Sequence, residues 1–379
     1  MGQPADSKKY ESWLMELVGL PTAAGYEDRV RSWIRAWARR RRRVSLHEDR
    51  YGNIELRRTG IPAPGNPVYF TAHMDHPAFV VRDVADSKVV IAEFRGGVSE
   101  SYFPRSKVLL HHSRVAPQRG TVRCRAADVG AESDGKGWDI HFPRPVRAAA
   151  GDILTWDIGP PRIVKGRLCG PACDDLAGLA AALSAFDRLL TIGGKDPRDI
   201  RVLLTRAEEI GFVGAMAAVK ARSIPRTSRL ITLECSKSFA DSPIGAGPIV
   251  RVGDRTSTFD PALTYHVGAI AAECASQDAS FRWQRKLMPG GTCEASAYQA
   301  FGFTATCLCL PLGNYHNMND SPTDPRIVAE VISLADFQDL VRLLVAIGSG
   351  LDETPVSASL RSRLKALFAQ RRNVLRPLG

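Results

Sequence analysis

Short apolar runs, separated by polar and glycine-rich turns, divide the sequence into three stretches with different patterns. In the first and third stretches, runs typical of buried strands alternate with segments whose apolar residues recur at helical spacing. The expected strands are 51–58, 67–73, 200–207, 229–234 and 304–310, and the expected helices are 8–18, 27–43, 176–190, 211–221, 296–301 and 327–347. This alternation is typical of an α/β fold.

The middle stretch, from about residue 77 to residue 165, follows a different pattern. It contains short β-rich segments such as FVVRDV, KVVIAEF and GTVRCR, which alternate with glycine, proline and serine, and no long helix fits it. This pattern predicts a small β-barrel or sandwich inserted into another fold. We expect a discontinuous α/β domain of residues 1–77 and 166–350, an inserted β-rich domain of residues 78–165, and a basic C-terminal helix or tail of residues 351–379.

Length and composition place the chain among ordinary globular proteins. It has 379 residues, 44% of them hydrophobic and 24% charged. No apolar run approaches the length of a membrane helix, and the N-terminus lacks the apolar core of a secretion signal, so we expect a cytoplasmic protein. The eight cysteines show no regular framework, which favours reduced thiols.

The formal net charge of +11 raises the question of an anionic partner. Much of the excess is local, in the run from Arg39 to Arg43 and in the terminal QRRNVLR. Trp33, Ile34 and Trp37 precede the arginine run at helical spacing, which indicates an amphipathic helix with a solvated basic end. No nucleic-acid-binding motif accompanies the charge, so we expect no nucleic-acid partner and no membrane partner.

Side chains that bind metals follow or end several of the predicted strands. They are His73 with Asp75 two residues later, the pair Glu208 and Glu209, Glu234, and His316. A further pair, Asp174 and Asp175 in CGPACDDLAGL, opens a predicted helix, where the alternative is a helix N-cap and a first-turn acid. Because strand ends of one sheet can converge on one edge, these side chains together predict a metal site. Mixed nitrogen and oxygen ligands suit zinc, cobalt or manganese.

Charge balance favours two metal ions. Two dications bring four positive charges, which the carboxylates of Asp174, Glu209 and Glu234 and one bridging hydroxide neutralise. One carboxylate must then bridge ions that lie ~3.5–4 Å apart. Successive side chains diverge, so Glu209 can bind a metal while Glu208 stays uncoordinated and acts as general base.

The order of these motifs resembles the dinuclear metal aminopeptidases, and within them the family of glutamyl and tetrahedral aminopeptidases. The order is H-x-D, D-D before a helix, E-E-x-G, an acid ending a strand, and a late histidine. The flanking stretches GLPTAAGYEDRVRSWI, DRYGNIELR and GAGPIVRVGDRTSTFDPAL belong to the resemblance, which covers roughly residues 10–347. It implies a mixed-sheet zinc-peptidase sandwich with helices on both faces and an inserted small β-barrel. It also implies peptide substrates and a large homo-oligomer.

The resemblance also assigns roles to the site residues. It implies an aminopeptidase that removes N-terminal residues from peptides, using two divalent metal ions per subunit and a metal-activated water. Zinc is the expected metal, with cobalt and manganese as alternatives. In this assignment His73 binds one ion, His316 binds the other, Asp174 bridges both, Glu209 and Glu234 bind one ion each, Asp75 orients His73, and Glu208 is the general base.

Four departures separate this sequence from the family pattern. The family reads H-M-D-E-I-G where this chain has His76 and Pro77, and an arginine is replaced by Leu176. The family's Gly-Thr-Asp-Ala is altered to GTCEAS, with Cys293 and Glu294, and the segment after His316 is lengthened. None of these changes removes a proposed ligand, so they indicate a divergent branch with an altered substrate pocket.

Two other functions are compatible with the same motifs. A carboxypeptidase or an amidohydrolase on the same scaffold would need a cation for the substrate carboxylate, and Arg251 and Arg255 are the candidates. A non-catalytic scaffold protein with a decayed site is the other alternative, against which the complete ligand set argues.

Overall fold

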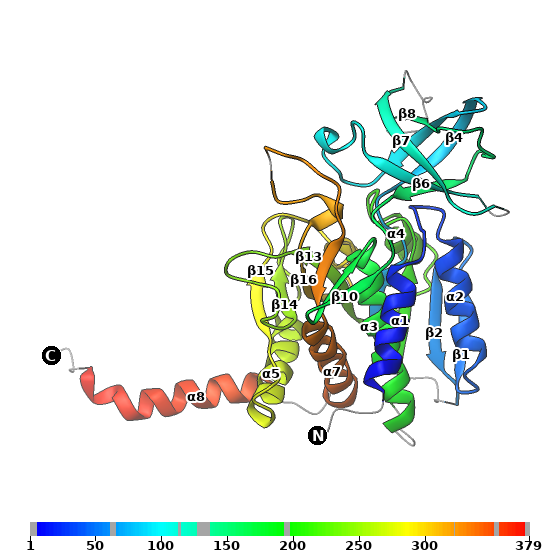
Figure 1. Cartoon of the computed structure of the whole chain (residues 1–379). Coiled ribbons are helices and arrows are strands. Elements are labelled where there is room, and N and C mark those ends of the chain that lie inside the picture. Colours follow the sequence, from blue (N-terminus) through cyan, green and yellow to red (C-terminus); the bar gives the residue numbers. More distant parts are fainter. Residues whose placement is uncertain are drawn as a thin grey trace.

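A computed structural model describes residues 6–60, 66–112, 115–126, 137–192, 198–321, 323–351 and 356–375, the side chains of 356–360 excepted. An α/β body carries a small β-barrel at one end, and the C-terminal helix α8 (Val356–Arg371) extends away from the opposite end (Figure 1). Two single 3-10 turns also lie in the C-terminal part of the chain, η2 (Tyr315–Asn317) before α8 and η3 (Arg372–Val374) directly after it. Within the described residues, no helix is both long enough and apolar enough to span a membrane.

A mixed sheet of eight strands forms the centre of the body. The strands, in spatial order, are β1 (Val44–Glu48), β2 (Ile54–Arg58), β12 (Ile200–Thr205), β3 (Val68–His73), β13 (Arg229–Lys237), β16 (Thr304–Leu312), β14 (Ile249–Gly253) and β15 (Gln284–Leu287). The four central strands from β12 to β16 run parallel, whereas β2 and β14 pair with them antiparallel. The carboxyl ends of the four parallel strands therefore share one edge of the sheet.

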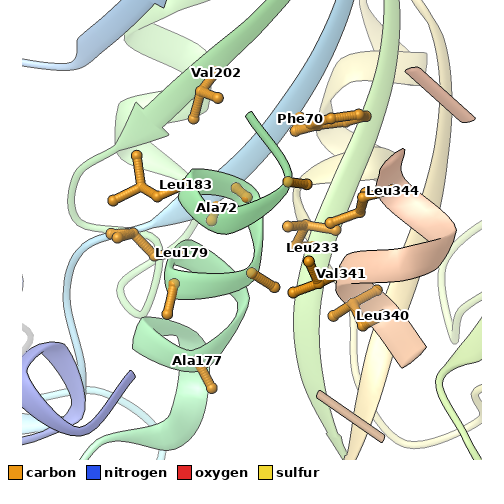
Figure 2. Close-up of a cluster of buried hydrophobic side chains, with 14 of the residues drawn as sticks. Phe70, Ala72, Ala177, Leu179, Leu183, Val202, Leu233, Leu340, Val341 and Leu344 are labelled. Atoms are coloured by element: carbon orange, nitrogen blue, oxygen red, sulfur yellow. The ribbon is translucent and has the colours of Figure 1, made fainter. Parts of the chain in front are cut away.

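Helices cover both faces of this sheet. One face packs against α1 (Ser7–Val18), α2 (Asp28–Arg39), α3 (Cys173–Ile192), α5 (Pro261–Gln277) and α7 (Leu334–Gly350), and the other packs against α4 (Val213–Lys220) and α6 (Glu294–Ala300). Strand β3 serves both layers, because Phe70 points to the first and Tyr69 to the second. Figure 2 shows part of the first layer, with Leu183 of α3, Leu233 of β13 and Leu340 of α7 among its side chains.

The insert is a closed barrel of six antiparallel strands. Their order is β4 (Ala78–Asp86), β5 (Val89–Arg95), β8 (Gly137–His141), β7 (Gln118–Arg125), β6 (Lys107–His111) and β9 (Ile153–Trp156), with the single turn η1 (Glu100–Tyr102) between β5 and β6. Aromatic rings fill its core, among them Phe79, Phe103 and Trp156. A three-stranded sheet of β10 (Arg162–Val164), β11 (Arg167–Gly170) and β17 (Glu330–Ser333) adjoins the body. The expected fold class, a mixed-sheet α/β sandwich with an inserted small barrel, is confirmed.

Two expected helices were wrong in extent. The helix expected over 27–43 ends at Arg39, and β1 begins at Val44, where it pairs with β2. The helix expected over 327–347 is split into β17 and α7. The β-branched Val331 and Ile332 pair with β11, and the Ser333 hydroxyl accepts the N–H of Asp336 to begin α7.

Candidate metal centre

The proposed ligands and the proposed general base come from five places in the fold. His73 ends β3, Glu208 and Glu209 lie between β12 and α4, Glu234 lies in β13, Asp174 opens α3, and His316 lies in η2 after β16. Asp174 opens a helix as expected, but the expectation that Glu234 ends its strand was wrong. Glu234 lies inside β13, which continues to Lys237, and the strand before Asp174 is β11 of the small sheet. The structure nevertheless brings these side chains together.

Asp174 lies between the two histidines. Its Oδ1 is 3.5 Å from Nε2 of His73, and its Oδ2 is 3.5 Å from Nε2 of His316. Its backbone is not helical, with φ −83° and ψ 111°, and Oδ1 has no hydrogen-bond partner among the described residues. The carboxylate therefore points at the imidazoles rather than capping the helix that it opens.

The remaining ligand candidates form two groups on either side of Asp174. On one side, Nε2 of His73 lies 3.7 Å from Oε1 of Glu234 and 3.9 Å from Oε2 of Glu208. On the other side, Nε2 of His316 lies 3.3 Å from Oε2 of Glu209. Within each group the candidate ligand atoms lie within 4.8 Å of one another. The arrangement thus offers two positions for cations that share one carboxylate.

Buried polar atoms without partners support the fit of metal ions. Nε2 of His73, Oδ1 of Asp174 and Oε1 of Glu209 have no hydrogen-bond partner among the described residues. Buried polar groups are costly unless they are paired, and imidazole with carboxylate is a donor set typical of divalent transition metals. The residues therefore fit two divalent ions.

The pKa values of the site residues are shifted, because several carboxylates are buried close together. Burial raises the pKa of the Glu208 carboxyl well above its ordinary value, and the charge of Glu209 raises it further. Burial lowers the pKa of His73, but the carboxylates of Glu208 and Asp174 outweigh it and bring that pKa well above the usual range. Positive charge stabilises the ionised carboxylates of this site. Among the ligand candidates and the proposed base, only the imidazoles of His73 and His316 can supply it.

Asp75 contacts both the histidine and the glutamate pair. Nδ1 of His73 lies 3.1 Å from the carbonyl oxygen of Asp75 and 3.5 Å from its carboxylate. The carboxylate itself accepts the backbone N–H groups of Glu208 and Glu209, each at 3.0 Å. The expected role of Asp75 was only to orient His73, and its contact with the backbone of the glutamate pair was not expected.

The barrel contributes to the site through its backbone. The carbonyl oxygen of Gly97, in the connection between β5 and β6, lies 2.7 Å from Nδ1 of His316. Because a carbonyl only accepts, Nδ1 donates, and Nε2 is left free to face Asp174. The lengthened segment after His316 rests on the same connection, since the Tyr102 hydroxyl donates to the Asn319 carbonyl at 2.8 Å.

Two further buried residues hold the site, and sequence analysis gave neither a role. Glu330 in β17 accepts the backbone N–H of Asp174 at 3.0 Å and that of His316 at 2.9 Å. His76 lies 2.5 Å from the Asp174 carbonyl through Nδ1. His76 was visible only as a departure from the family pattern, and Glu330 was hidden in an expected helix. Asp175 is also buried, and its two carboxylate oxygens have no hydrogen-bond partner among the described residues.

A cavity of about 130 Å³ opens beside the two groups. Arg251 lines it, but its guanidinium donates to the Ser236 hydroxyl at 3.2 Å and to the Gly291 carbonyl at 3.3 Å. It also lies 3.7 Å from the Asp254 carboxylate. Arg255 is exposed and does not line this cavity. Arg251 is therefore largely engaged within the protein.

The chain is similar to known aminopeptidases both in sequence and in structure. Residues 145–342 match the family model described as M42 glutamyl aminopeptidase. An aminopeptidase from the archaeon Desulfurococcus kamchatkensis is similar in structure, with a TM-score of 0.73 and 20% sequence identity over 90% of this chain and 94% of that chain. The TET1 peptidase of Pyrococcus horikoshii, which can assemble into a tetrahedron or a large octahedral shell, has a TM-score of 0.71 at 18% identity over 89% of this chain and 99% of its own.

Proposed function

Because the chain belongs to the M42 glutamyl aminopeptidase family and is a metal-dependent peptide-bond hydrolase, we propose that it removes residues from the free N-terminus of peptides. The observation that carries the proposal is the position of Asp174, whose two carboxylate oxygens each face one imidazole at 3.5 Å. A single shared carboxylate between two donor groups is what a pair of metal ions requires.

The ligands we propose fall into two sets. His73 and Glu234 hold one divalent ion, His316 and Glu209 hold the other, and Asp174 bridges them. Zinc is the metal we propose, with cobalt and manganese as alternatives of similar ligand preference. When bound, such ions polarise the scissile carbonyl and lower the pKa of water at the site.

Glu208 is the general base in this proposal. Its carboxylate takes a proton from the attacking water and passes it to the leaving amine. Burial raises the pKa of Glu208, which makes its carboxylate a stronger base. Asp75 keeps Glu208 and Glu209 in place by accepting both of their backbone N–H groups, so that the two side chains serve different roles.

The contacts of Arg251 disfavour a carboxypeptidase or amidohydrolase of N-acylated amino acids. Such an enzyme needs a free cation for the substrate carboxylate, whereas Arg251 is engaged by Ser236, Gly291 and Asp254. The complete set of buried donors disfavours a scaffold protein with a decayed site. We also propose that the chain forms a homo-oligomer, by analogy with the Pyrococcus horikoshii peptidase.

A matched substrate pair tests the function. The purified chain, with zinc, cobalt or manganese added back, is assayed on aminoacyl p-nitroanilides and on their N-acetylated counterparts. We expect release from the free-amine substrates only, and loss of release after chelation. Hydrolysis of N-acetylated amino acids with a free carboxylate, assayed beside the p-nitroanilides, would favour the amidohydrolase. The absence of any hydrolysis of the free-amine substrates with two bound metals would contradict the proposal.

A further inference from the structure

The peptide backbone of Asp174 is held at both of its polar groups by buried side chains from distant parts of the chain. Its N–H donates to Oε2 of Glu330 at 3.0 Å, and its carbonyl accepts from Nδ1 of His76 at 2.5 Å. Glu330 is completely buried, and His76 is 4% exposed. Backbone N–H groups at the start of a helix have no partner within the helix, and the Glu330 carboxylate supplies one for Asp174.

Glu330 also fixes a second proposed ligand. Its other oxygen, Oε1, accepts the N–H of His316 at 2.9 Å. His76 is itself anchored, because its Nε2 lies 3.0 Å from Oδ1 of Asn317, the residue after His316. Asn317 in turn donates to the carbonyl of Pro171 at 3.1 Å. The segment before Asp174 and the segment around His316 are therefore joined through buried polar contacts.

The geometry of Asp174 makes such support necessary. Its side chain is short, so a small backbone displacement moves the carboxylate by nearly the same amount. The conformation is not helical at Asp174, with ψ 111°, so the regular hydrogen bonds of α3 do not fix this residue. A carboxylate that serves two cations loses its function when it is displaced by about 1 Å.

We propose that Glu330 and His76 are positioning residues that fix the backbone of Asp174 so that its carboxylate reaches both metal positions. This inference rests on the proposed dinuclear function. Because Glu330 holds both Asp174 and His316, its loss affects the ion at the His316 and Glu209 side more than the ion at the His73 side. His76 acts on Asp174 directly and on His316 only through the neighbouring Asn317.

The competing explanation is that both residues only satisfy buried backbone groups and thereby stabilise the fold. The two explanations differ in metal affinity. Removal of a purely structural hydrogen bond lowers the thermal stability of the metal-free chain and leaves the affinity for both ions unchanged. Removal of a positioning contact raises the dissociation constant of an ion by about 10–100-fold.

Three variants and one matched control separate these explanations. Glu330→Gln presents an amide NH2 to one of the two N–H groups and so removes one acceptor. His76→Phe keeps the ring but removes the donor, whereas His76→Asn places an amide N–H close to the position of Nδ1. The control is Glu55→Gln, because Glu55 is also buried but contacts Tyr69 and Arg201 rather than a proposed ligand.

The measurements are calorimetric titration of the metal-free full-length chain with Zn²⁺, the visible spectrum after Co²⁺ loading, and thermal unfolding without metal. We expect Glu330→Gln and His76→Phe to weaken one ion by about 10–100-fold and to change the cobalt spectrum, with His76→Asn close to wild type. Glu55→Gln should change only the unfolding temperature. If His76→Phe and any folded Glu330→Gln chain both bind two ions at wild-type affinity, the inference is overturned, but the dinuclear assignment still stands. Fewer than two ions bound by the wild-type chain would instead overturn the dinuclear assignment on which it rests.

Discussion

The carboxylate of Asp75 accepts the backbone N–H of Glu208 at 3.0 Å. Strands β3 and β12 are parallel neighbours with His73 opposite Thr205, so the segments that leave them run side by side at the same edge. Asp75, which follows β3, thus fixes the path of the segment that follows β12. The proposed general base therefore depends on a residue that holds its backbone.

Replacement of Asp75 by asparagine should reduce activity without unfolding the chain. The amide keeps the shape of the carboxylate but presents NH2 to one of the two N–H groups that Asp75 accepts. We expect kcat/KM to fall about 10–100-fold. The control is Asp336→Asn, because Asp336 also accepts two backbone N–H groups, from Gly245 and Gly247, neither of which is a proposed site residue. Equal losses in both variants would contradict a specific role for Asp75.

Replacement of Glu208 by glutamine should separate catalysis from metal binding. The variant should keep both metal ions and the wild-type unfolding temperature, and it should lose at least ~10²-fold in kcat, the usual scale for a general base. Glu209→Gln, one residue away, should instead reduce metal content. The checks are metal analysis and steady-state kinetics of the loaded variants. Wild-type turnover in a fully loaded Glu208→Gln chain would end its assignment as base.

Replacement of Asp174 by alanine should disturb both ions, whereas His73→Ala and His316→Ala should each weaken mainly one. Two dications at bridging distance repel each other, and the shared carboxylate offsets that repulsion. Metal content per chain, measured after dialysis at a fixed free metal concentration, checks the expectation. If purified Asp174→Ala retains two ions per chain, the bridge belongs to another carboxylate.

His111 in the barrel should make the chain sensitive to mild acid. Burial, and to a smaller extent the Arg29 cation, lower the pKa of its imidazole to about 4. An unfolded histidine takes up a proton near pH 6.5, so the folded state loses stability as the pH falls from 6.5 to 4, by on the order of 3 kcal/mol in total. Above pH 6.5 this contribution is fully present.

Urea denaturation at pH 7 and pH 4.5 tests the role of His111. The difference in unfolding free energy between the two pH values should be smaller in His111→Gln than in wild type. His47→Gln is the control, because His47 is exposed. Equal acid sensitivity in wild type and His111→Gln would show that other groups dominate.

Removal of the C-terminal segment should leave the rest of the chain folded. We propose residues 1–77 with 166–350, residues 78–165 and residues 351–379 as the three units of the chain. The described side chains of α8 are exposed, with Leu364 56% and Phe368 62% exposed. A chain that ends at Leu351 should keep its unfolding temperature within about 2 °C, since exposed positions away from buried features contribute little. Calorimetry checks the temperature, and light scattering checks the mass. A large drop in mass would show that α8 packs against another copy, whereas a large drop in temperature alone would show that it stabilises its own chain, where it lies against α5.

The parts of the fold that sequence analysis predicted correctly are those with a local signature. Central parallel strands such as β12 and β16 are nearly continuous apolar runs, because both of their faces are buried. Strand β17 has no such signature, since Val331 and Ile332 fit a helix or a strand. Their pairing with β11, far away in the sequence, decides between the two. Strand β1 was missed for a related reason, because VSLHE at an edge of the sheet is only partly buried.

In the candidate site, too, some residues could be predicted from the sequence and others could not. Histidines and carboxylates beside apolar runs are visible in the sequence, because their chemistry is specific. The groups that hold them are less visible. Glu330 acts on two backbone N–H groups, and Gly97 acts through its own carbonyl, so neither contact depends on a pair of complementary side chains.

The contact between Gly97 and His316 has an evolutionary consequence. A methyl group added at position 97 would lie 3.6 Å from the imidazole, which is an ordinary contact, so alanine fits there and would present the same carbonyl. Natural variation at this position can therefore include alanine while the path and length of the connection between β5 and β6 stay under selection. Insertions and deletions in that connection, rather than substitutions, are the changes that homologues should avoid.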